Sequence, residues 1–204
     1  MNKNALDILQ DYHAILSDGH FAYTSGRHGS QYVNKDAIYP HTDAVSKLCE
    51  WMAEGFSKHS IEVVLGPALG GIVLSQWTAF HLSRIQKKDV LAVFAEKLDE
   101  NKFALKRGYD EIIKGKKVLV VEDILNTGGS AKRLVELVAA ASAELVGVSV
   151  LCNRGGVTEK ELGTEAKLMS LVNLDFKTWD AADCPLCKKG VPLNKTVGKG
   201  KIPT

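Results

Sequence analysis

Residues 118–130 of this chain read V-L-V-V-E-D-I-L-N-T-G-G-S. The run opens with apolar and β-branched residues typical of a buried strand, reaches the adjacent acids Glu122 and Asp123, and ends in small residues before a helical apolar pattern over 131–141. The residues from Thr127 to Ser130 can turn backbone N–H groups and hydroxyls toward a phosphate, beside the positive end of that helix. We therefore predict a strand, a loop and a helix of an α/β fold, with a site for a phosphomonoester at the loop.

The two acids must bind a different part of the ligand from the part that the glycine-rich loop binds. Glu122 and Asp123 would repel the phosphate, whereas adjacent carboxylates suit either the two vicinal hydroxyls of a ribose or a Mg²⁺ ion, since both take oxygen acceptors. A sugar phosphate fits the whole run. The alternative is an ordinary helix N-terminus with two solvated acids, but it requires neither the tandem acids nor the paired glycines.

Similar units flank this one and define the fold class. Apolar runs alternate with amphipathic stretches, which predicts an α/β fold with a mostly parallel central sheet flanked by helices. Residues 20–35 instead predict a hairpin with a polar, basic tip, and residues 96–114 are polar, highly charged and weakly periodic. The expected strands are 61–65, 90–95, 118–121, 145–151 and 167–174, and the expected helices are 4–16, 43–59, 72–82 and 131–141.

The composition bounds the class of protein. A length of 204 residues with 45% hydrophobic and 25% charged residues fits one ordinary globular domain and excludes the disordered and disulfide-scaffold classes. A net charge of +2 is too mild to favour nucleic acid as a partner. Sparse cysteines and the lack of a leader pattern favour the cytoplasm. Residues 63–83 are uncharged over a length that could span a membrane, but glycines and a proline at 66–71 favour a buried strand, a loop and a helix.

A second glycine loop, G-P-A-L-G-G at 66–71, follows the strand expected at 61–65. It does not match G-x-G-x-x-G, and the chain contains no G-x-x-x-x-G-K-[ST], so the fingerprints of dinucleotide binding and of Walker-type NTP hydrolysis are missing. The bare backbone of the loop allows main-chain amides to approach a second anionic group such as a pyrophosphate. A tight strand-to-helix turn explains the same glycines equally well.

The tandem-acid loop at 118–130 resembles the signature for phosphoribosyl pyrophosphate (PRPP) in type I phosphoribosyltransferases. Further motifs resemble the orotate phosphoribosyltransferase family in the same order: T-S-G-R at 24–27, Y-V-N at 32–34, the loop at 66–71, F-A-E-K at 94–97, L-K-R-G at 105–108, N-R at 153–154 and D-C-P-L-C at 183–187. The resemblance covers nearly the whole chain. It implies the type I phosphoribosyltransferase fold as a single domain over 1–204, with a small N-terminal hood at about 18–40 and an irregular basic tail from about 188.

The implied reaction is Mg²⁺-dependent transfer of the phosphoribosyl group from PRPP to orotate, which gives orotidine 5′-monophosphate and pyrophosphate in UMP biosynthesis. The family further implies a cytoplasmic homodimer whose mobile lid, in the polar stretch at 96–114, is shared across the interface, without a nucleic-acid or membrane partner. Lid cations would stabilise the charge that develops on the leaving pyrophosphate, and a closed lid would exclude water.

The resemblance also assigns residues to the two substrates. The PRPP-binding residues would be Glu122, Asp123, Ile124, Leu125, Asn126, Thr127, Gly128, Gly129, Ser130, Lys97, Lys102, Lys106, Arg107, Leu69 and Gly70. The orotate-binding residues would be Arg154, Asn126, Tyr32, Val33 and Arg27. The candidates for catalysis are Asp123, Lys97 and Lys102. Mg²⁺ would be held mainly by PRPP, with Asp123 the one candidate ligand from the protein.

Departures from the best-known family pattern leave two alternatives open. Thr24 and Gly70 stand where that pattern has Lys, and Asn126 stands where it has Thr, so the base specificity is less secure than PRPP binding. One alternative is a phosphoribosyltransferase for another base, against which Arg154 argues, because its planar guanidinium suits the orotate carboxylate that purines lack. The other is a non-catalytic PRPP-binding regulator, for which the sequence offers no winged-helix extension.

The cysteines and histidines give a weaker signal. Cys184-x-x-Cys187 supplies only two thiols, whereas a structural zinc needs about four ligands. All six histidines fall within the first 81 residues without metal spacing, and His28 is singled out because it lies on the tip of the expected hood. We interpret the Cys184–Cys187 segment as a packed turn rather than a zinc site.

Overall fold

The computed structural model describes residues 3–23, 25–99 and 102–197. The chain divides into two compact units. We call His41–Leu174 the sheet unit, and we call the remainder, residues up to Pro40 together with those from Asp175 onward, the terminal unit. Thr24 lies outside the described residues, as do Lys199 and Lys201 of the expected basic tail.

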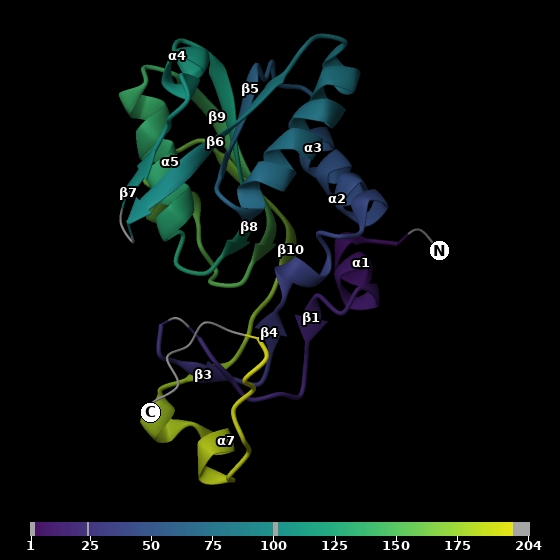
Figure 1. Cartoon of the computed structure of the whole chain (residues 1–204), viewed down its shortest axis with the longest axis vertical. Helices are drawn as coiled ribbons and strands as arrows, with labels where there is room; N and C mark the ends of the chain where they lie inside the picture. The colour runs from purple at the N-terminus through teal and green to yellow at the C-terminus, as the bar shows by residue number, and fades with distance from the viewer. Residues whose placement is uncertain (1–2, 24, 100–101, 198–204) are drawn as a thin grey trace. The chain divides into compact units, whose positions relative to one another are not determined.

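The sheet unit contains a six-stranded sheet in the order β10-β9-β8-β5-β6-β7. Its parallel strands are β5 (Val63–Pro67), β6 (Leu91–Asp99), β8 (Lys117–Leu125), β9 (Glu144–Asn153) and β10 (Lys167–Asn173), and β7 (Lys102–Ala104) pairs antiparallel with β6. In Figure 1, α2 (Thr42–Glu54) and α3 (Gly70–Gln86) cover one face, and α4 (Tyr109–Ile113) and α5 (Gly129–Ala140) cover the other. A short helix, α6 (Glu159–Leu162), follows β9. The predicted α/β fold with a mostly parallel sheet is confirmed.

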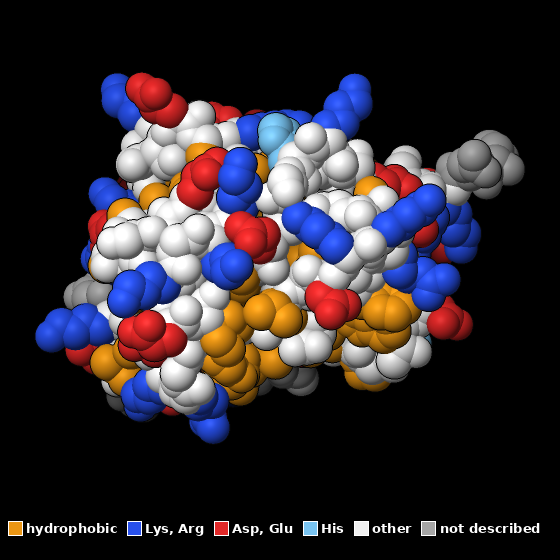
Figure 2. Space-filling model, turned by 90° about the horizontal axis from the view of Figure 1, so that it is seen from above, with side chains coloured by type: hydrophobic (Ala, Val, Ile, Leu, Met, Phe, Trp, Pro, Cys, Tyr) orange, Lys and Arg blue, Asp and Glu red, His pale blue; other side chains and the backbone are white. Residues whose placement is uncertain are grey.

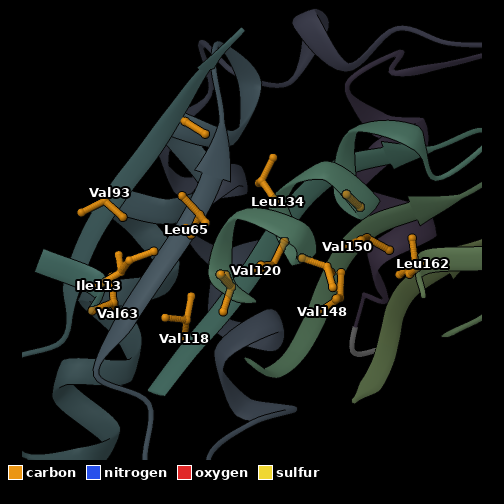
Figure 3. Packing of buried hydrophobic residues seen from close by; sticks show 14 of the residues in the cluster. Val63, Leu65, Val93, Ile113, Val118, Val120, Leu134, Val148, Val150 and Leu162 are labelled. Atoms are coloured by element: carbon orange, nitrogen blue, oxygen red, sulfur yellow. The ribbon is translucent and has the colours of Figure 1, made fainter. Parts of the chain in front are cut away.

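One hydrophobic core cluster of this unit lies between the sheet and α5. Figure 3 shows Val118 and Val120 of β8 beside Val148 and Val150 of β9, with Leu134 of α5 packed among them. Alternate residues of a strand point to the same face, so each of these pairs presents two side chains to one layer. Both faces of the sheet are covered, and this explains why the strands are nearly continuous apolar runs in the sequence.

The strand order reverses between β5 and β8. The chain continues from β5 to β6 on one side, whereas β8, β9 and β10 follow one another on the other side. Ligands of open α/β sheets bind beyond the carboxyl ends of the strands at such a reversal. The two predicted anion loops follow β5 and β8, which are neighbours in the sheet. The topology therefore brings these loops together at the carboxyl ends of the strands.

The terminal unit is built from short elements. Helix α1 (Ala5–Asp11) leads to β1 (Ile15–Leu16), which pairs with β4 (Tyr32–Val33). A separate three-stranded antiparallel sheet has β3 (His28–Gly29) at its centre, between β2 (Phe21–Ala22) and β11 (Thr178–Trp179). The other elements are η1 (Lys35–Ala37), η2 (Ala181–Asp183) and α7 (Pro185–Lys188). A hairpin does form within the predicted segment 20–35, but its second arm is β3, which lies inside the expected tip, whereas β4 pairs with β1.

Other boundaries differ from the prediction for physical reasons. The first helix ends at Asp11 because His13 takes a left-handed conformation, with φ at 53°, and turns the chain into β1. Strand β8 continues past Val121 because its ladder with β9 runs on to the pair Leu125–Asn153. The polar stretch after Ala95 forms the β6–β7 pair and α4 rather than one long loop. The described residues after α7, up to Val197, form no helix or strand, and the Asn194 N–H donates to His20 O at 2.7 Å.

The uncharged stretch 63–83 forms β5, a loop and part of α3, as predicted. Among the described residues, no helix combines enough length with enough apolar character to span a membrane. Figure 2 shows basic and acidic side chains interspersed over the face in view, with hydrophobic side chains between them. The balanced charge of the sequence is thus mixed across this face.

Candidate active site

A small pocket lies where β8 ends and α5 begins. Its volume is about 90 Å³, and it is lined by Glu122 and by residues 124–131. Gly128 precedes the helix with φ at +75°, and a Cβ there would lie 2.9 Å from Val157 Cγ1, so the position requires glycine on two grounds. The first N–H groups of a helix lack intrahelical acceptors and, with the helix dipole, favour an anion. Residues 126–130 therefore line a pocket at a helix N-terminus, and its use as a phosphate site stays a prediction.

The two acids lie within β8, at the mouth of this loop. Glu122 and Asp123 are 5% and 6% exposed. The Asp123 N–H donates to Glu122 Oε1 at 3.0 Å, and the Ile124 N–H donates to Asp123 Oδ1 at 2.7 Å. The ladder between β5 and β8 ends at Val120, so both acids follow the point where β8 loses that neighbour. Buried carboxylates are costly unless they accept hydrogen bonds or meet a cation, which makes this pair suitable for ribose hydroxyls or a hard divalent ion.

The loop after β9 lies directly against the phosphate loop. The N–H groups of Arg154 and Gly155 both donate to Leu125 O, at 2.9 and 3.1 Å. A Cβ on Gly155 would come within 1.6 Å of Asn126 O, so only glycine allows this approach of the two backbones. The structure thus brings together Arg154 and Asn126, two of the residues that the resemblance assigns to orotate.

Asn153 has a role that the sequence reasoning missed. Its buried side chain donates from Nδ2 to Val157 O at 2.7 Å and accepts at Oδ1 from the Val157 N–H at 3.0 Å. The two bonds close the turn that carries Arg154 and hold Val157 beneath Gly128. Asparagine after an apolar strand often bonds to nearby backbone in this way, but the sequence alone does not say which backbone groups it meets.

The adjacent thiol of Cys152 is buried. Burial raises the pKa of Cys152 to about 12, so the thiol stays protonated at neutral pH. Burial likewise raises the pKa of Cys49 to about 12.

The loop after β5 contains glycines required for packing and residues that are accessible to a ligand. A Cβ on Gly66 would lie 2.2 Å from Gly71 O, and a Cβ on Gly71 would lie 2.3 Å from Pro67 Cδ, so these two glycines permit the tight packing of β5 against α3. The intervening residues are different, since Leu69 is 84% exposed and Gly70 is half-buried. The peptide bond between Ala68 and Leu69 is cis. Leu69 and Gly70 are therefore the accessible part of the loop.

The predicted lid cations are carried by the β6–β7 pair and the turn after it. Lys97 on β6 and Lys102 on β7 are exposed. Lys106 Nζ lies 3.3 Å from Glu96 Oε2, and Arg107 Nη2 lies 2.9 Å from Glu96 Oε1. These neighbours, Lys106 first, lower the pKa of Glu96. Two of the four predicted cations are thus paired with an acid of the same hairpin.

The remaining orotate candidates belong to the terminal unit. Tyr32 stacks on Phe21 with ring centroids 5.5 Å apart, and Val33 is buried. The Arg27 guanidinium donates to Thr178 Oγ1, Thr178 O and Asp180 Oδ1, each at 2.9 Å. These bonds give Arg27 a structural role, because they fasten the hairpin tip to β11 and the segment that follows it.

The fold and the site together define a class of α/β proteins that bind a sugar phosphate at the strand-order reversal of a parallel sheet. Residues 34–182 match the family model described as the phosphoribosyl transferase domain. The chain is 37% identical over 181 residues to an orotate phosphoribosyltransferase of Caldanaerobacter subterraneus, covering 89% of this chain and 90% of that protein. It is 34% identical over 202 residues to one of Caldicellulosiruptor bescii, covering 98% and 100%. The chain belongs to the orotate phosphoribosyltransferase family.

Solved structures share the fold. The orotate phosphoribosyltransferase of Mycobacterium tuberculosis in complex with inorganic phosphate aligns with a TM-score of 0.66 at 23% identity, over 83% of this chain and 95% of that one. The same enzyme in complex with PRPP aligns with a TM-score of 0.57 at 24% identity, over 70% and 80%.

Proposed function

We propose that this protein transfers the phosphoribosyl group of PRPP to orotate. The bond between the ribose carbon and the pyrophosphate oxygen breaks, a bond from that carbon to a ring nitrogen of orotate forms, and the nitrogen loses its proton. The observation that carries the proposal is the direct contact of the Arg154 loop with the phosphate loop, through Leu125 O and Asn126. One site then holds a sugar phosphate beside a guanidinium suited to a carboxylate.

The pocket at residues 126–130 would hold the 5′-phosphate, and Glu122 and Asp123 would accept hydrogen bonds from the ribose hydroxyls. The Mycobacterium tuberculosis relative, which shares the fold, is known in complex with PRPP, and this supports PRPP as the ligand. The donor set of buried carboxylates also fits Mg²⁺, with Asp123 the residue that would contact it. When bound, Mg²⁺ would neutralise charge on the pyrophosphate.

The reaction needs stabilisation of two opposite charges. The ribose carbon becomes cationic as the pyrophosphate leaves, and the Asp123 carboxylate would stabilise that positive charge. Lys97 and Lys102 would stabilise the negative charge of the leaving group. Lys106 and Arg107 would join them by breaking their ion pairs with Glu96 and pairing with the pyrophosphate instead.

Arg154→Ala is expected to raise the KM for orotate by about 10–100-fold, because a hydrogen bond to a charged group contributes about 1.5–3 kcal/mol. The KM for PRPP should change little. The measurement is orotate-dependent pyrophosphate release, with uracil, hypoxanthine and adenine as competing bases. Arg133→Ala, which removes an exposed guanidinium paired with Glu136 on α5, is the matched control.

Unchanged orotate kinetics in Arg154→Ala would contradict the assignment of that residue and favour another base. Orotate consumption is measured by the loss of orotate's ultraviolet absorbance. A protein that binds PRPP with Mg²⁺ but does not consume orotate would instead favour the non-catalytic regulator.

We further propose a homodimer in which each lid serves the partner's site. Mixing Lys102→Ala with Asp123→Asn under conditions of subunit exchange should then restore about a quarter of the wild-type activity, since half of the dimers are mixed and each regains one complete site. Activity no higher than the sum of the two separate variants would show that the lid acts within its own chain or that the protein does not form this dimer.

A further inference from the structure

Four metal-binding side chains converge in the terminal unit, outside the phosphoribosyl site. They are His20, His28, Cys184 and Cys187, and their donor atoms all lie within 4.8 Å of one another. His20 precedes β2, His28 lies in β3, and the cysteines flank the first turn of α7. The hairpin thus places two further potential ligands beside the C-x-x-C segment, which by itself offers only two thiols.

Four of the six distances between the donor atoms are close to the edges of a tetrahedral site. His20 Nε2 and His28 Nδ1 are 3.0 Å apart. The Cys184 Sγ lies 3.5 Å from His20 Nε2, and the Cys187 Sγ lies 3.6 Å from the same atom and 3.3 Å from His28 Nδ1. Bond lengths of about 2.0–2.1 Å to nitrogen and about 2.3 Å to sulfur give donor separations of roughly 3.3–3.8 Å around a tetrahedral zinc. The four separations given above are close to these values, and all six are at most 4.8 Å.

The imidazole of His20 is oriented for such a role. Its Nδ1 lies 2.7 Å from Val191 O, so the ring donates from Nδ1 to this carbonyl and keeps the Nε2 lone pair facing the cluster. Metal-binding histidines typically have a backbone carbonyl or carboxylate on the second ring nitrogen in this way. His20, His28 and Cys184 are 2%, 7% and 0% exposed, so three of the four donors are held in a closed environment.

We propose that the terminal unit binds one structural zinc ion through His20, His28, Cys184 and Cys187. Two thiolates and two imidazoles in a tetrahedron select zinc over Mg²⁺, which prefers oxygen ligands. Four protein ligands close the coordination sphere, so the ion serves structure and not catalysis. A disulfide between Cys184 and Cys187 would use the thiols alone and leave the convergence of the two histidines without a purpose.

The unit has a physical need for such an ion. Strands β2, β3 and β11 each span two residues, and so short a sheet is not stable by itself. The ligands join the N-terminal hairpin to a segment about 160 residues further along the chain. Small units with little core are commonly stabilised by a metal, and the free energy of metal binding then contributes to folding.

The test is the metal content of the untagged full chain, expressed with added zinc and dialysed against zinc-free buffer. We expect about one zinc per chain in the wild type. Replacement by Co²⁺ should give the visible and thiolate charge-transfer absorption of a tetrahedral site. Cys187→Ser should lose the zinc, because the exposed position of Cys187 lets the substitution remove a ligand with little effect on packing. Cys49→Ala also removes one thiol but lies in α2, and it should retain the metal.

Chelation of the wild type should lower the melting temperature, and added zinc should restore it. A wild-type chain that holds neither zinc nor Co²⁺, or that is isolated with a Cys184–Cys187 disulfide, would overturn the proposal. So would zinc retained by Cys187→Ser at the wild-type level. If that variant does not fold, the wild-type zinc and Co²⁺ measurements decide. No substrate is used in these measurements, so they stand apart from the outcome for the transferase activity.

Discussion

Asp123→Asn is expected to lower kcat by about 10²–10³-fold, the range seen when one preorganised electrostatic contact to a transition state is removed. The substitution keeps the shape of a side chain that is 6% exposed and whose Oδ1 accepts from the Ile124 N–H. It removes the negative charge proposed to stabilise the cationic ribose. Steady-state kinetics with both substrates, together with a thermal unfolding curve, measure the effect.

The matched control is Asp89→Asn, which neutralises an exposed acid before β6. It should leave kcat near the wild-type value. If Asp123→Asn changes kcat no more than this control does, Asp123 does not stabilise the transition state. If kcat and the melting temperature fall together, its role is structural.

Gly155→Ala is expected to disrupt both loops of the site at once. The added Cβ would meet Asn126 O at 1.6 Å, and backbone on both sides leaves no flexible side chain that could yield. The turn that carries Arg154 or the phosphate loop must therefore move, and displacements of this size near reacting groups can cost about 10²-fold in rate. We expect kcat/KM to fall by at least about 10²-fold for both PRPP and orotate, as measured by initial rates.

Gly156→Ala separates steric contact from backbone strain at the neighbouring position. Gly156 has φ at +61°, and no described atom lies within 4 Å of the place that a Cβ would take, so its substitution costs only the left-handed conformation, about 1–2 kcal/mol. Its kinetic effect should be much smaller than that of Gly155→Ala. Equal effects of the two substitutions would mean that strain in the turn, and not contact with Asn126, limits the site.

Much of the sheet unit could be predicted because its signals are local. The apolar run at 118–121 and the small residues at 127–130 directly reflect a buried strand and an anion loop. The boundaries of the strands were less predictable, since they depend on how far the neighbouring strands continue to pair. Glu122 and Asp123 remain in β8 because its pairing with β9 runs on to Leu125, and no local pattern of acids predicts a strand.

The sequence by itself determined the α/β class, the phosphate loop and the identity of the charged residues, because periodicity and loop composition are properties of neighbouring residues. Only the tertiary structure decided which distant groups meet. It placed Gly155 against Asn126, gave Asn153 its bonds to Val157, and joined His20 and His28 to the cysteines of α7. Such contacts depend on the path of the whole chain. No local sequence pattern predicts that residues about 160 positions apart will lie next to each other.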